Sequence, residues 1–508
     1  MTSSWVFENV DLDELKAIAE RLSVFLQVGD VLLLNGSLGA GKTTFARFIL
    51  RALHPSGPDL QVPSPTFSIM QNYATASFEI HHFDFFRLES ANEIRELDLE
   101  TSIEDGVCLI EWPERARELL PADRLNIEIE DGTGDEQRTI KLRGEGCWGQ
   151  KLARIQEIWR FVETTQWQSS VWRYLQGDAS TRRYIRLESP AHPALMVDSP
   201  ARSDGPVIKH GMTYSQIAHL AEDAGAFIAI SGYLTSIGIR APQVLANDLS
   251  KGLFIVEDLG KEVYSRLISA NKPIEPLYRA ALDVLLGLGR HQVPESLPVA
   301  KTGEQYTIPV YDTPALTVEV ELFLEWHLKL RKDLEISENH EDKFISVWQE
   351  LFGSLEHEKN HLVLRDFHSP NLIFLDDRKS ASSVGVIDFQ DGVRGPEAYD
   401  VVSLLQDARV DIPQDIESRL LDYYCAQRRS DDCTFDEKQF RRQYALLGAQ
   451  RNTKILGIFA RLAIRDSKPQ YLKHIPRIWG YLERNLSNDY LCDLKHWYDH
   501  AIHPENRC

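Results

Sequence analysis

The stretch DVLLLNGSLGAGKTTFARFIL (residues 30–50) begins as an apolar run, passes through a glycine-rich turn and continues as an amphipathic helical pattern. The fixed positions of the motif GxxxxGK[ST] are occupied by Gly36, Gly41, Lys42 and Thr43. In such a loop the backbone N–H groups surround phosphate oxygens, the lysine reaches the terminal phosphates and the threonine hydroxyl can bind Mg²⁺. The stretch therefore predicts a P-loop NTPase-like α/β domain that binds ATP and Mg²⁺.

Three further motifs each end or flank an apolar, strand-like run: VPSPTFSIMQNY (residues 62–73), EIHHFDFFRL (79–88) and CLIEWPER (108–115). Together with the loop they resemble the TsaE family, small bacterial ATPases of the threonylcarbamoyladenosine tRNA-modification system, across most of residues 5–145. The resemblance implies that the nucleotide and its metal are surrounded by Thr66, Asp84 and Glu111, in addition to the loop residues Gly36, Gly39, Gly41, Lys42, Thr43 and Thr44. Phe86 replaces the usual tyrosine of the second motif.

The acidic residues of these motifs are the chemically informative ones. Glu111 follows a buried strand-like run, where a carboxylate can bind magnesium or position water opposite the P-loop threonine. The alternative for Glu111 is a surface acid beside the Trp-Pro pair that follows it. Asp84 has two alternative roles: it belongs to the metal shell, or it makes a local hydrogen bond to the backbone or a nearby arginine. We expect His81 and His82 to be structural.

A second set of motifs lies in HLVLRDFHSPNLIFL (residues 361–375) and VGVIDFQDGVRGPEAYD (384–400), with the spacing D-x4-N followed by a strand that ends in aspartate. Phosphoryl transfer to a hydroxyl group needs a carboxylate that accepts the hydroxyl hydrogen, and an asparagine and an aspartate that hold magnesium and phosphate. These positions are occupied by Asp366, Asn371 and Asp388. The spacing predicts an ATP-dependent phosphotransferase.

These segments resemble the aminoglycoside phosphotransferase superfamily over roughly residues 165–490. Within it they are similar to the AmgK-like kinases, which phosphorylate the anomeric hydroxyl of N-acetylmuramate and N-acetylglucosamine. The resemblance implies a protein-kinase-like, two-lobed α+β domain with a largely helical C-lobe. It also implies that Asp400 anchors the catalytic loop through hydrogen bonds and does no chemistry.

The nucleotide contacts of this second domain are also implied by the resemblance. The segment GDASTRRY (residues 177–184) is similar to the turn that covers the phosphates, and it contributes Gly177 and Arg183. The segment GLFIVEDLG leads into a hinge, where backbone groups from Glu257 to Leu259 would meet the adenine edge.

Two departures from the family pattern matter. The lysine that follows the first hairpin in most relatives is missing from ALMVDSP (residues 194–200), so another cation must substitute. Candidates are Arg182, Arg183 and Arg186, although an arginine-rich hairpin is also a common solvated face. Leu364 stands where many kinases have a histidine that is largely scaffold. The alternative is a pseudokinase that binds nucleotide without transferring phosphate.

Composition and charge limit the function further. With 43% apolar and 26% charged residues the chain is an ordinary globular protein, and its formal charge of −20 argues against direct binding of nucleic acid. Residues 1–150 carry −13 of that charge, which suits docking on TsaB/TsaD-like tRNA-modification proteins better than on RNA. Six scattered cysteines, no signal sequence and no long apolar run predict a cytoplasmic protein without a membrane span.

The chain therefore divides into a TsaE-like ATPase domain (residues 1–150) and a sugar-kinase domain (residues 160–508), joined by a glycine-rich exit at residues 144–149. We expect the halves to fold independently. The favoured function is bifunctional; the alternatives are a nucleotide-dependent regulator and a kinase for another small alcohol, such as an aminoglycoside or choline. A muramate carboxylate would need an arginine, for which Arg451 and Arg461 are available. The oligomeric state stays open.

Overall fold

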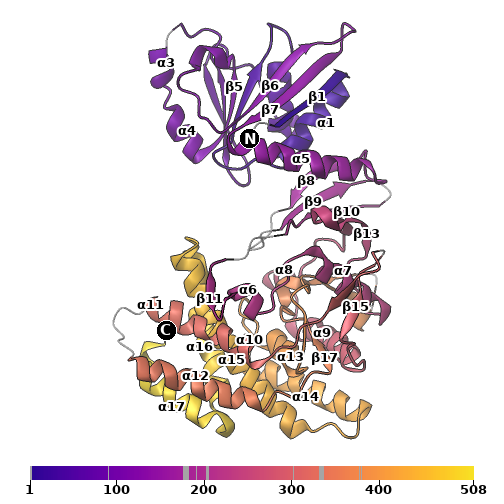
Figure 1. Ribbon diagram of the computed structural model, residues 1–508, viewed down its shortest axis with the longest axis vertical. Coiled ribbons are helices and arrows are strands. Elements are labelled where there is room, and N and C mark those ends of the chain that lie inside the picture. The colour runs from indigo at the N-terminus through magenta and orange to yellow at the C-terminus, as the bar shows by residue number, and fades with distance from the viewer. Residues whose placement is uncertain are drawn as a thin grey trace. The chain divides into compact units, whose positions relative to one another are not determined.

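The computed structural model describes residues 3–89, 91–175, 182–189, 192–201, 205–300, 302–330, 337–376, 378 and 380–507 (Figure 1). The chain forms two compact units. The first comprises Met1–Ser199 and Ala246–Val256, and the second Pro200–Leu245 and Glu257–Cys508. The boundary predicted near residue 150 lies inside the first unit, so the limits of the two functional domains stay a prediction.

The first unit contains a mixed seven-stranded sheet of order β1-β7-β6-β2-β5-β4-β3. Its strands are β1 (Ser3–Val10), β2 (Val31–Asn35), β3 (Met70–Ala74), β4 (Glu79–Asp84), β5 (Gly106–Glu111), β6 (Arg124–Asp131) and β7 (Arg138–Glu145). The central strands β6, β2, β5 and β4 are parallel, and the outer pairings are antiparallel. All of β5 and all but the last residue of β2 are buried, as expected for parallel strands covered on both faces.

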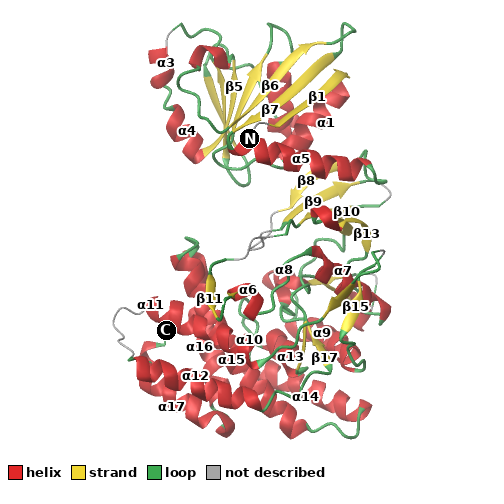
Figure 2. Ribbon diagram, in the orientation of Figure 1, coloured by secondary structure: helices red, strands yellow, loops and turns green. Residues whose placement is uncertain are grey.

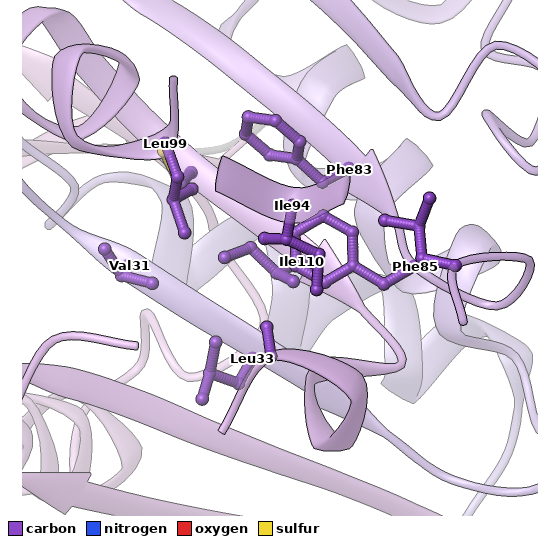
Figure 3. Packing of buried hydrophobic residues seen from close by; sticks show 10 residues of the cluster. Val31, Leu33, Phe83, Phe85, Ile94, Leu99 and Ile110 are labelled. Carbon is purple, nitrogen blue, oxygen red and sulfur yellow. The ribbon is translucent and has the colours of Figure 1, made fainter. Parts of the chain in front are cut away.

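The helices of this sheet are α1 (Leu12–Ser23), α2 (Lys42–Leu53), α3 (Ala91–Arg95), α4 (Leu99–Asp105) and α5 (Cys147–Glu163). A capping box starts α1: the Asp11 carboxylate accepts a hydrogen bond from the Glu14 backbone N–H, and the Glu14 carboxylate accepts one from the Asp11 backbone N–H. An apolar core that includes Phe83, Phe85 and Ile110 packs β2, β4 and β5 together (Figure 3). This core fixes the strand ends that carry the polar motif residues.

The glycine-rich join is a packed corner. Strand β7 continues through Gly144, and α5 begins only two residues after β7 ends. A Cβ atom on Gly144 would lie 2.3 Å from the carbonyl oxygen of Trp148, so the glycine permits a close backbone approach. Trp148 is buried, and Lys151 in the next turn forms an ion pair with Asp30. The glycine-rich join at residues 144–149, between the two predicted domains, is therefore part of the packed first unit.

A second sheet of order β13-β14-β10-β9-β8 follows α5, and in it β9 pairs antiparallel with both β8 and β10. Its strands are β8 (Val171–Leu175), β9 (Arg183–Glu188), β10 (Ala194–Asp198), β13 (Val244–Asp248) and β14 (Leu253–Glu257). Strands β8 and β9 pair antiparallel, with Val171 opposite Glu188 and Leu175 opposite Tyr184. The turn that joins these two strands lies outside the described residues.

An aromatic cluster joins the two sheets of the first unit through α5. The indole of Trp159 lies 5.0 Å from Trp5 of β1 and 5.6 Å from Trp172 of β8, measured between ring centroids. Phe25, just after α1, lies 6.2 Å from Trp172. The Arg21 guanidinium lies 4.6 Å from the Trp159 ring and 5.0 Å from the Trp172 ring. Residues from both predicted domains therefore share one buried cluster.

The second unit is mainly helical (Figure 2). Its helices are α6 (Tyr214–Ile217), α7 (Ala224–Ser236), α8 (Tyr264–Ser269), α9 (Ile274–Gly289), α10 (Thr313–Leu322), α11 (Leu328–Leu330), α12 (Glu338–Gly353), α13 (Ala398–Leu405), α14 (Gln414–Asp431), α15 (Glu437–Ile464), α16 (Ile475–Leu486) and α17 (Cys492–Ala501). The long α15 packs against α10, α13 and α16. In the described part of the chain, no helix is both long and apolar enough to cross a membrane.

Short two-stranded ladders complete this unit. They pair β11 (Val207–Lys209) with β12 (Met212–Thr213), β15 (Ser296–Pro298) with β16 (Gln305–Thr307), β17 (His361–Val363) with β20 (Val393–Gly395), and β18 (Leu372–Phe374) with β19 (Val384–Val386). The last two ladders carry the kinase motifs at their ends. The predicted fold class, an α/β domain followed by a kinase-like domain with a largely helical C-terminal part, is confirmed.

Candidate active sites

The P-loop connects β2 to α2 as the motif predicts. Gly39 and Gly41 have positive φ angles of 82° and 112°, a conformation that favours glycine. A Cβ atom on Gly36 would lie 2.5 Å from the carbonyl oxygen of Ile129, so this position also needs glycine. Thr43 and Thr44 lie half-buried in the first turn of α2.

Lys42 is folded back onto the loop. Its Nζ donates hydrogen bonds to the carbonyl oxygens of Gly36 (2.8 Å) and Ser37 (2.9 Å), and lies 3.8 Å from the centre of the Trp112 ring. Burial lowers the pKa of Lys42, although the nearby Glu111 carboxylate opposes that shift. The ammonium group thus already lies in the loop that would surround phosphates.

Glu111 lies at the end of β5 and is 2% exposed, so the alternative of a surface acid is wrong. Its Oε2 accepts a hydrogen bond from the Thr43 hydroxyl at 3.0 Å. Its Oε1 lies 2.9 Å from Nε2 of His82. Both carboxylate oxygens are therefore held, one of them directly beside the hydroxyl predicted to bind Mg²⁺.

Asp84 connects two of the sequence motifs. Its Oδ2 accepts hydrogen bonds from the hydroxyls of Thr66 (2.5 Å) and Ser64 (3.3 Å), while its Oδ1 accepts one from the backbone N–H of Phe86 (2.9 Å). The structure thus brings Thr66 to Asp84, and it also shows the local backbone bond that was one of the two readings of Asp84. A role in the metal shell stays a prediction.

The sequence predicts a structural role for His82, and the structure pairs its imidazole with Glu111. The imidazole is fully buried in β4, one strand away from β5. The informative signal is its location two residues before Asp84 on the same strand. The strand register that brings His82 to Glu111 is not visible in the sequence.

In the second unit, one asparagine joins the predicted kinase residues. Nδ2 of Asn371 donates hydrogen bonds to the backbone carbonyl of Asp366 (3.0 Å) and to Oδ2 of Asp388 (3.3 Å). Gln390 donates to the other oxygen of Asp388 at 3.0 Å. Asp388 and Arg365 both have left-handed backbones, with φ of 61° and 66°, a strained conformation that is common at functional sites.

The loop that carries Asp366 is anchored from α13. The Asp400 carboxylate accepts hydrogen bonds from the backbone N–H groups of Leu364 (2.6 Å) and Arg365 (3.0 Å), in agreement with the expected anchoring role. Burial raises the pKa of Asp400 to about 7, against the effect of these two bonds. For Asp366 burial also raises the pKa, but electrostatic interactions with His368, Lys454 and Arg365 outweigh it and hold the pKa below its ordinary value.

A buried ion network lies behind this loop. The fully buried Glu319 of α10 forms ion pairs with Arg365 and with Lys454, whose Nζ lies 2.7 Å away. The hydroxyl of Tyr311 (2.5 Å) and the amide of Gln450 (2.9 Å) also donate to it. Although burial alone would raise it, these cations lower the pKa of Glu319 to about 2.

The remaining predicted nucleotide contacts have different surroundings. Glu257 forms an ion pair with Arg240, and its backbone N–H donates to Gln243 (2.9 Å), so that N–H is already used. Leu259 packs on Gly385 of β19, the strand before Asp388.

In the first unit, the Arg183 guanidinium lies 5.2 Å from the Phe25 ring. Gly177 lies outside the described residues.

Among the described residues no three His, Cys, Asp or Glu side chains form a set that could hold a metal alone. Mg²⁺ in nucleotide sites usually takes only one or two protein ligands and completes its octahedron with phosphate and water. The pair of Thr43 with Glu111 and the pair of Asn371 with Asp388 both have oxygen donors of that kind. Each pair therefore fits a magnesium-nucleotide site.

Comparison with known proteins gives two separate matches. Residues 10–140 match the family model described as threonylcarbamoyl adenosine biosynthesis protein TsaE, and residues 171–439 match the one described as phosphotransferase enzyme family. A protein named N-acetylmuramate/N-acetylglucosamine kinase from Caulobacter vibrioides is 36% identical over 342 residues, 66% of this chain and 92% of the relative. A kinase of the same name from Pseudomonas putida is 33% identical over 60% of this chain and 80% of the relative.

For the N-terminal part, a protein named tRNA threonylcarbamoyladenosine biosynthesis protein TsaE from Rickettsia felis is 42% identical over 121 residues, 23% of this chain and 70% of the relative. Both resemblances drawn from the sequence motifs are thereby confirmed. The two matches do not overlap, and each includes one of the candidate active sites described above. The chain belongs to the TsaE family through residues 10–140 and to the phosphotransferase enzyme family through residues 171–439.

Proposed function

We propose that this is a bifunctional enzyme. Residues 1–150 act as an ATPase that supports threonylcarbamoyladenosine modification of tRNA, with TsaB/TsaD-like proteins as partners. Residues 160–508 use ATP to phosphorylate the anomeric hydroxyl of N-acetylmuramate and N-acetylglucosamine. Both reactions use ATP with Mg²⁺ and take place in the cytoplasm. The names of the relatives of each part support this assignment.

In the ATPase site, the loop residues Gly36, Gly39, Gly41, Lys42, Thr43 and Thr44 would bind the triphosphate. Lys42 would exchange its two bonds to loop carbonyls for the terminal phosphate. Glu111, held between Thr43 and His82, would bind magnesium or orient the attacking water. Asp84 and Thr66 would complete the polar surround. When bound, the metal offsets the negative charge that develops on the phosphates.

In the kinase site, Asp366 would accept the hydrogen of the sugar hydroxyl while Asn371 and Asp388 hold magnesium and the phosphates. Nδ2 of Asn371 is occupied by Asp366 and Asp388, so its amide oxygen is the atom that would bind the metal. The lowered pKa of Asp366 keeps it ionised and able to accept a proton. Backbone groups of Glu257 and Leu259, together with Gly177 and Arg183, are the proposed nucleotide contacts.

The observation that carries the kinase proposal is the hydrogen-bonded set of Asp366, Asn371 and Asp388, because Asp366 and Asp388 are 22 residues apart in sequence yet both accept hydrogen bonds from the amide of Asn371. The test is a radiolabelled phosphate-transfer screen with purified protein and four acceptors: N-acetylmuramate, N-acetylglucosamine, an aminoglycoside and choline. Label on the two amino sugars supports the proposal. Label on choline or the aminoglycoside alone would contradict it.

A further inference from the structure

A fully buried carboxylate lies behind the catalytic loop and is held by four donors. Oε1 of Glu319, in α10, accepts hydrogen bonds from the Arg365 guanidinium and from Nζ of Lys454, the latter at 2.7 Å. Oε2 accepts hydrogen bonds from the hydroxyl of Tyr311 (2.5 Å) and from the side-chain amide of Gln450 (2.9 Å). A carboxylate offers about four acceptor positions, so the protein itself uses the hydrogen-bonding capacity of Glu319.

The Arg365 side chain is fixed through both terminal nitrogens of its guanidinium. One nitrogen binds Glu319, and the other donates to the carbonyl oxygen of Ala218 at 2.8 Å. The guanidinium also lies 5.1 Å from the centre of the Tyr311 ring. The backbone of Arg365 has a φ of 66°, a strained conformation that persists only where the surroundings hold it. These side-chain contacts and the hydrogen bond from its backbone N–H to Asp400 hold Arg365 in that conformation.

The carboxylate of Asp366, the next residue, is not held in this way. Its side chain is 45% exposed, and within the described part of the chain neither of its oxygens accepts a hydrogen bond. Nε2 of His368 lies 3.8 Å from Oδ1, which is beyond hydrogen-bond distance. Asn371 and Asp388, in contrast, are hydrogen-bonded to each other. The direction of the Asp366 carboxylate therefore depends on the backbone at residues 365 and 366.

We propose that Glu319 is a positioning residue for sugar phosphorylation: by holding Arg365, it keeps the backbone that directs the Asp366 carboxylate towards the acceptor hydroxyl. This inference rests on the proposed kinase function. Two of the donors that hold Glu319, Gln450 and Lys454, belong to α15 and lie beyond residue 439, where the match to the phosphotransferase family model ends. The catalytic loop is thus held by a part of the chain outside that match.

The first test is Glu319→Gln, which keeps the size of the side chain and removes its charge. A displacement of about 1 Å at a reacting group can cost about a hundredfold in rate. We therefore expect kcat for N-acetylmuramate phosphorylation to fall about ten- to hundredfold. The KM values for sugar and ATP should change less than about threefold, since the binding groups stay in place. The kcat is expressed per folded chain, with the folded fraction taken from circular dichroism.

The second test asks whether Glu319 acts through Asp366. Two residues that act on one step are not additive, so Glu319→Gln should lower kcat less than about threefold further when Asp366→Asn is already present. A general loosening of the fold would instead reduce kcat by the same factor in both backgrounds. Equal factors in the two backgrounds, a loss confined to KM, or no loss in Glu319→Gln would each overturn the positioning role.

The matched control is Glu417→Gln in α14. This buried carboxylate also accepts hydrogen bonds from a tyrosine, a glutamine and an arginine, namely Tyr444, Gln406 and Arg484, and none of these donors belongs to the catalytic loop. Its kcat per folded chain should equal that of the wild type. A loss in Glu417→Gln as large as that in Glu319→Gln would overturn the proposal.

A milder variant keeps the proposal testable if Glu319→Gln does not fold. Tyr311→Phe removes one donor to Glu319 and keeps the ring beside Arg365. We expect a smaller loss of kcat, about three- to tenfold, that disappears when Asp366→Asn is present. An unchanged kcat, or the same loss in both backgrounds, would overturn the positioning role while the kinase assignment stands. If the wild-type chain phosphorylates neither sugar, the proposed function itself fails.

Discussion

Replacement of Trp172 by alanine tests whether the two halves share a core. Trp172 is 1% exposed, and its ring contacts Trp159, Phe25 and the Arg21 guanidinium. Removal of a buried tryptophan side chain costs about 3–5 kcal/mol, against a total stability of about 5–15 kcal/mol for a typical domain. We predict that Trp172→Ala lowers the free energy of unfolding of the first unit by about that amount.

The assay is urea unfolding with two readouts at each urea concentration. One is binding of a fluorescent ATP analogue at the P-loop, and the other is sugar phosphorylation. Trp172 lies in the phosphotransferase match, whereas Phe25 and Arg21 lie in the TsaE match, so both activities should disappear at lower urea concentration. Tyr174→Ala is the matched control, because Tyr174 lies on the same strand and is 50% exposed. If Trp172→Ala weakened only sugar phosphorylation and left the urea midpoint of nucleotide binding unchanged, the shared core would be refuted.

Further predictions concern the individual sites. Asp366→Asn should reduce sugar phosphorylation about 10²- to 10⁴-fold with little change in ATP affinity, whereas Asp388→Asn should weaken binding of magnesium-ATP; equal, small effects in a kinetic assay would contradict both roles. Glu111→Gln should abolish most ATP hydrolysis while equilibrium binding of ATP persists, and His82→Ala should lower kcat more than it changes KM; a change in KM alone would argue against the pairing with Glu111. Because the folded pKa of Glu319 is depressed from 4.5 to about 2, its stabilising effect is complete above pH 4.5 and is lost as the pH falls towards 2. In Glu319→Gln, the loss of stability that Glu319 causes between pH 4.5 and pH 2 should be missing from the acid unfolding curve measured by circular dichroism. An acid transition identical to that of the wild type would contradict this stabilising effect of Glu319.

Local motifs were readable from the sequence because each fixes its own backbone. The P-loop needs glycine at Gly36 and Gly41 for close approach and positive φ, and the spacing of Asp366 and Asn371 reflects one turn of chain. These requirements act within a few residues, so they appear in the sequence as fixed residue types at fixed spacings.

Contacts between distant elements were not readable. His82 reaches Glu111 only through the parallel register of β4 and β5, which the sequence does not show. The role of Gly144 could not be predicted from the sequence. A glycine that permits close backbone packing cannot be distinguished there from a glycine in a flexible linker.

The central claim is that one chain carries two separate ATP-dependent active sites. The most direct test is transfer of labelled phosphate from ATP to N-acetylmuramate by the purified full chain, its Lys42→Ala variant and its Asp366→Asn variant, with ATP hydrolysis measured without sugar in parallel. We predict sugar phosphate from the wild type and from Lys42→Ala but almost none from Asp366→Asn, while only Lys42→Ala loses the sugar-independent hydrolysis. Loss of sugar phosphorylation in folded Lys42→Ala, or its survival in Asp366→Asn, would contradict the claim.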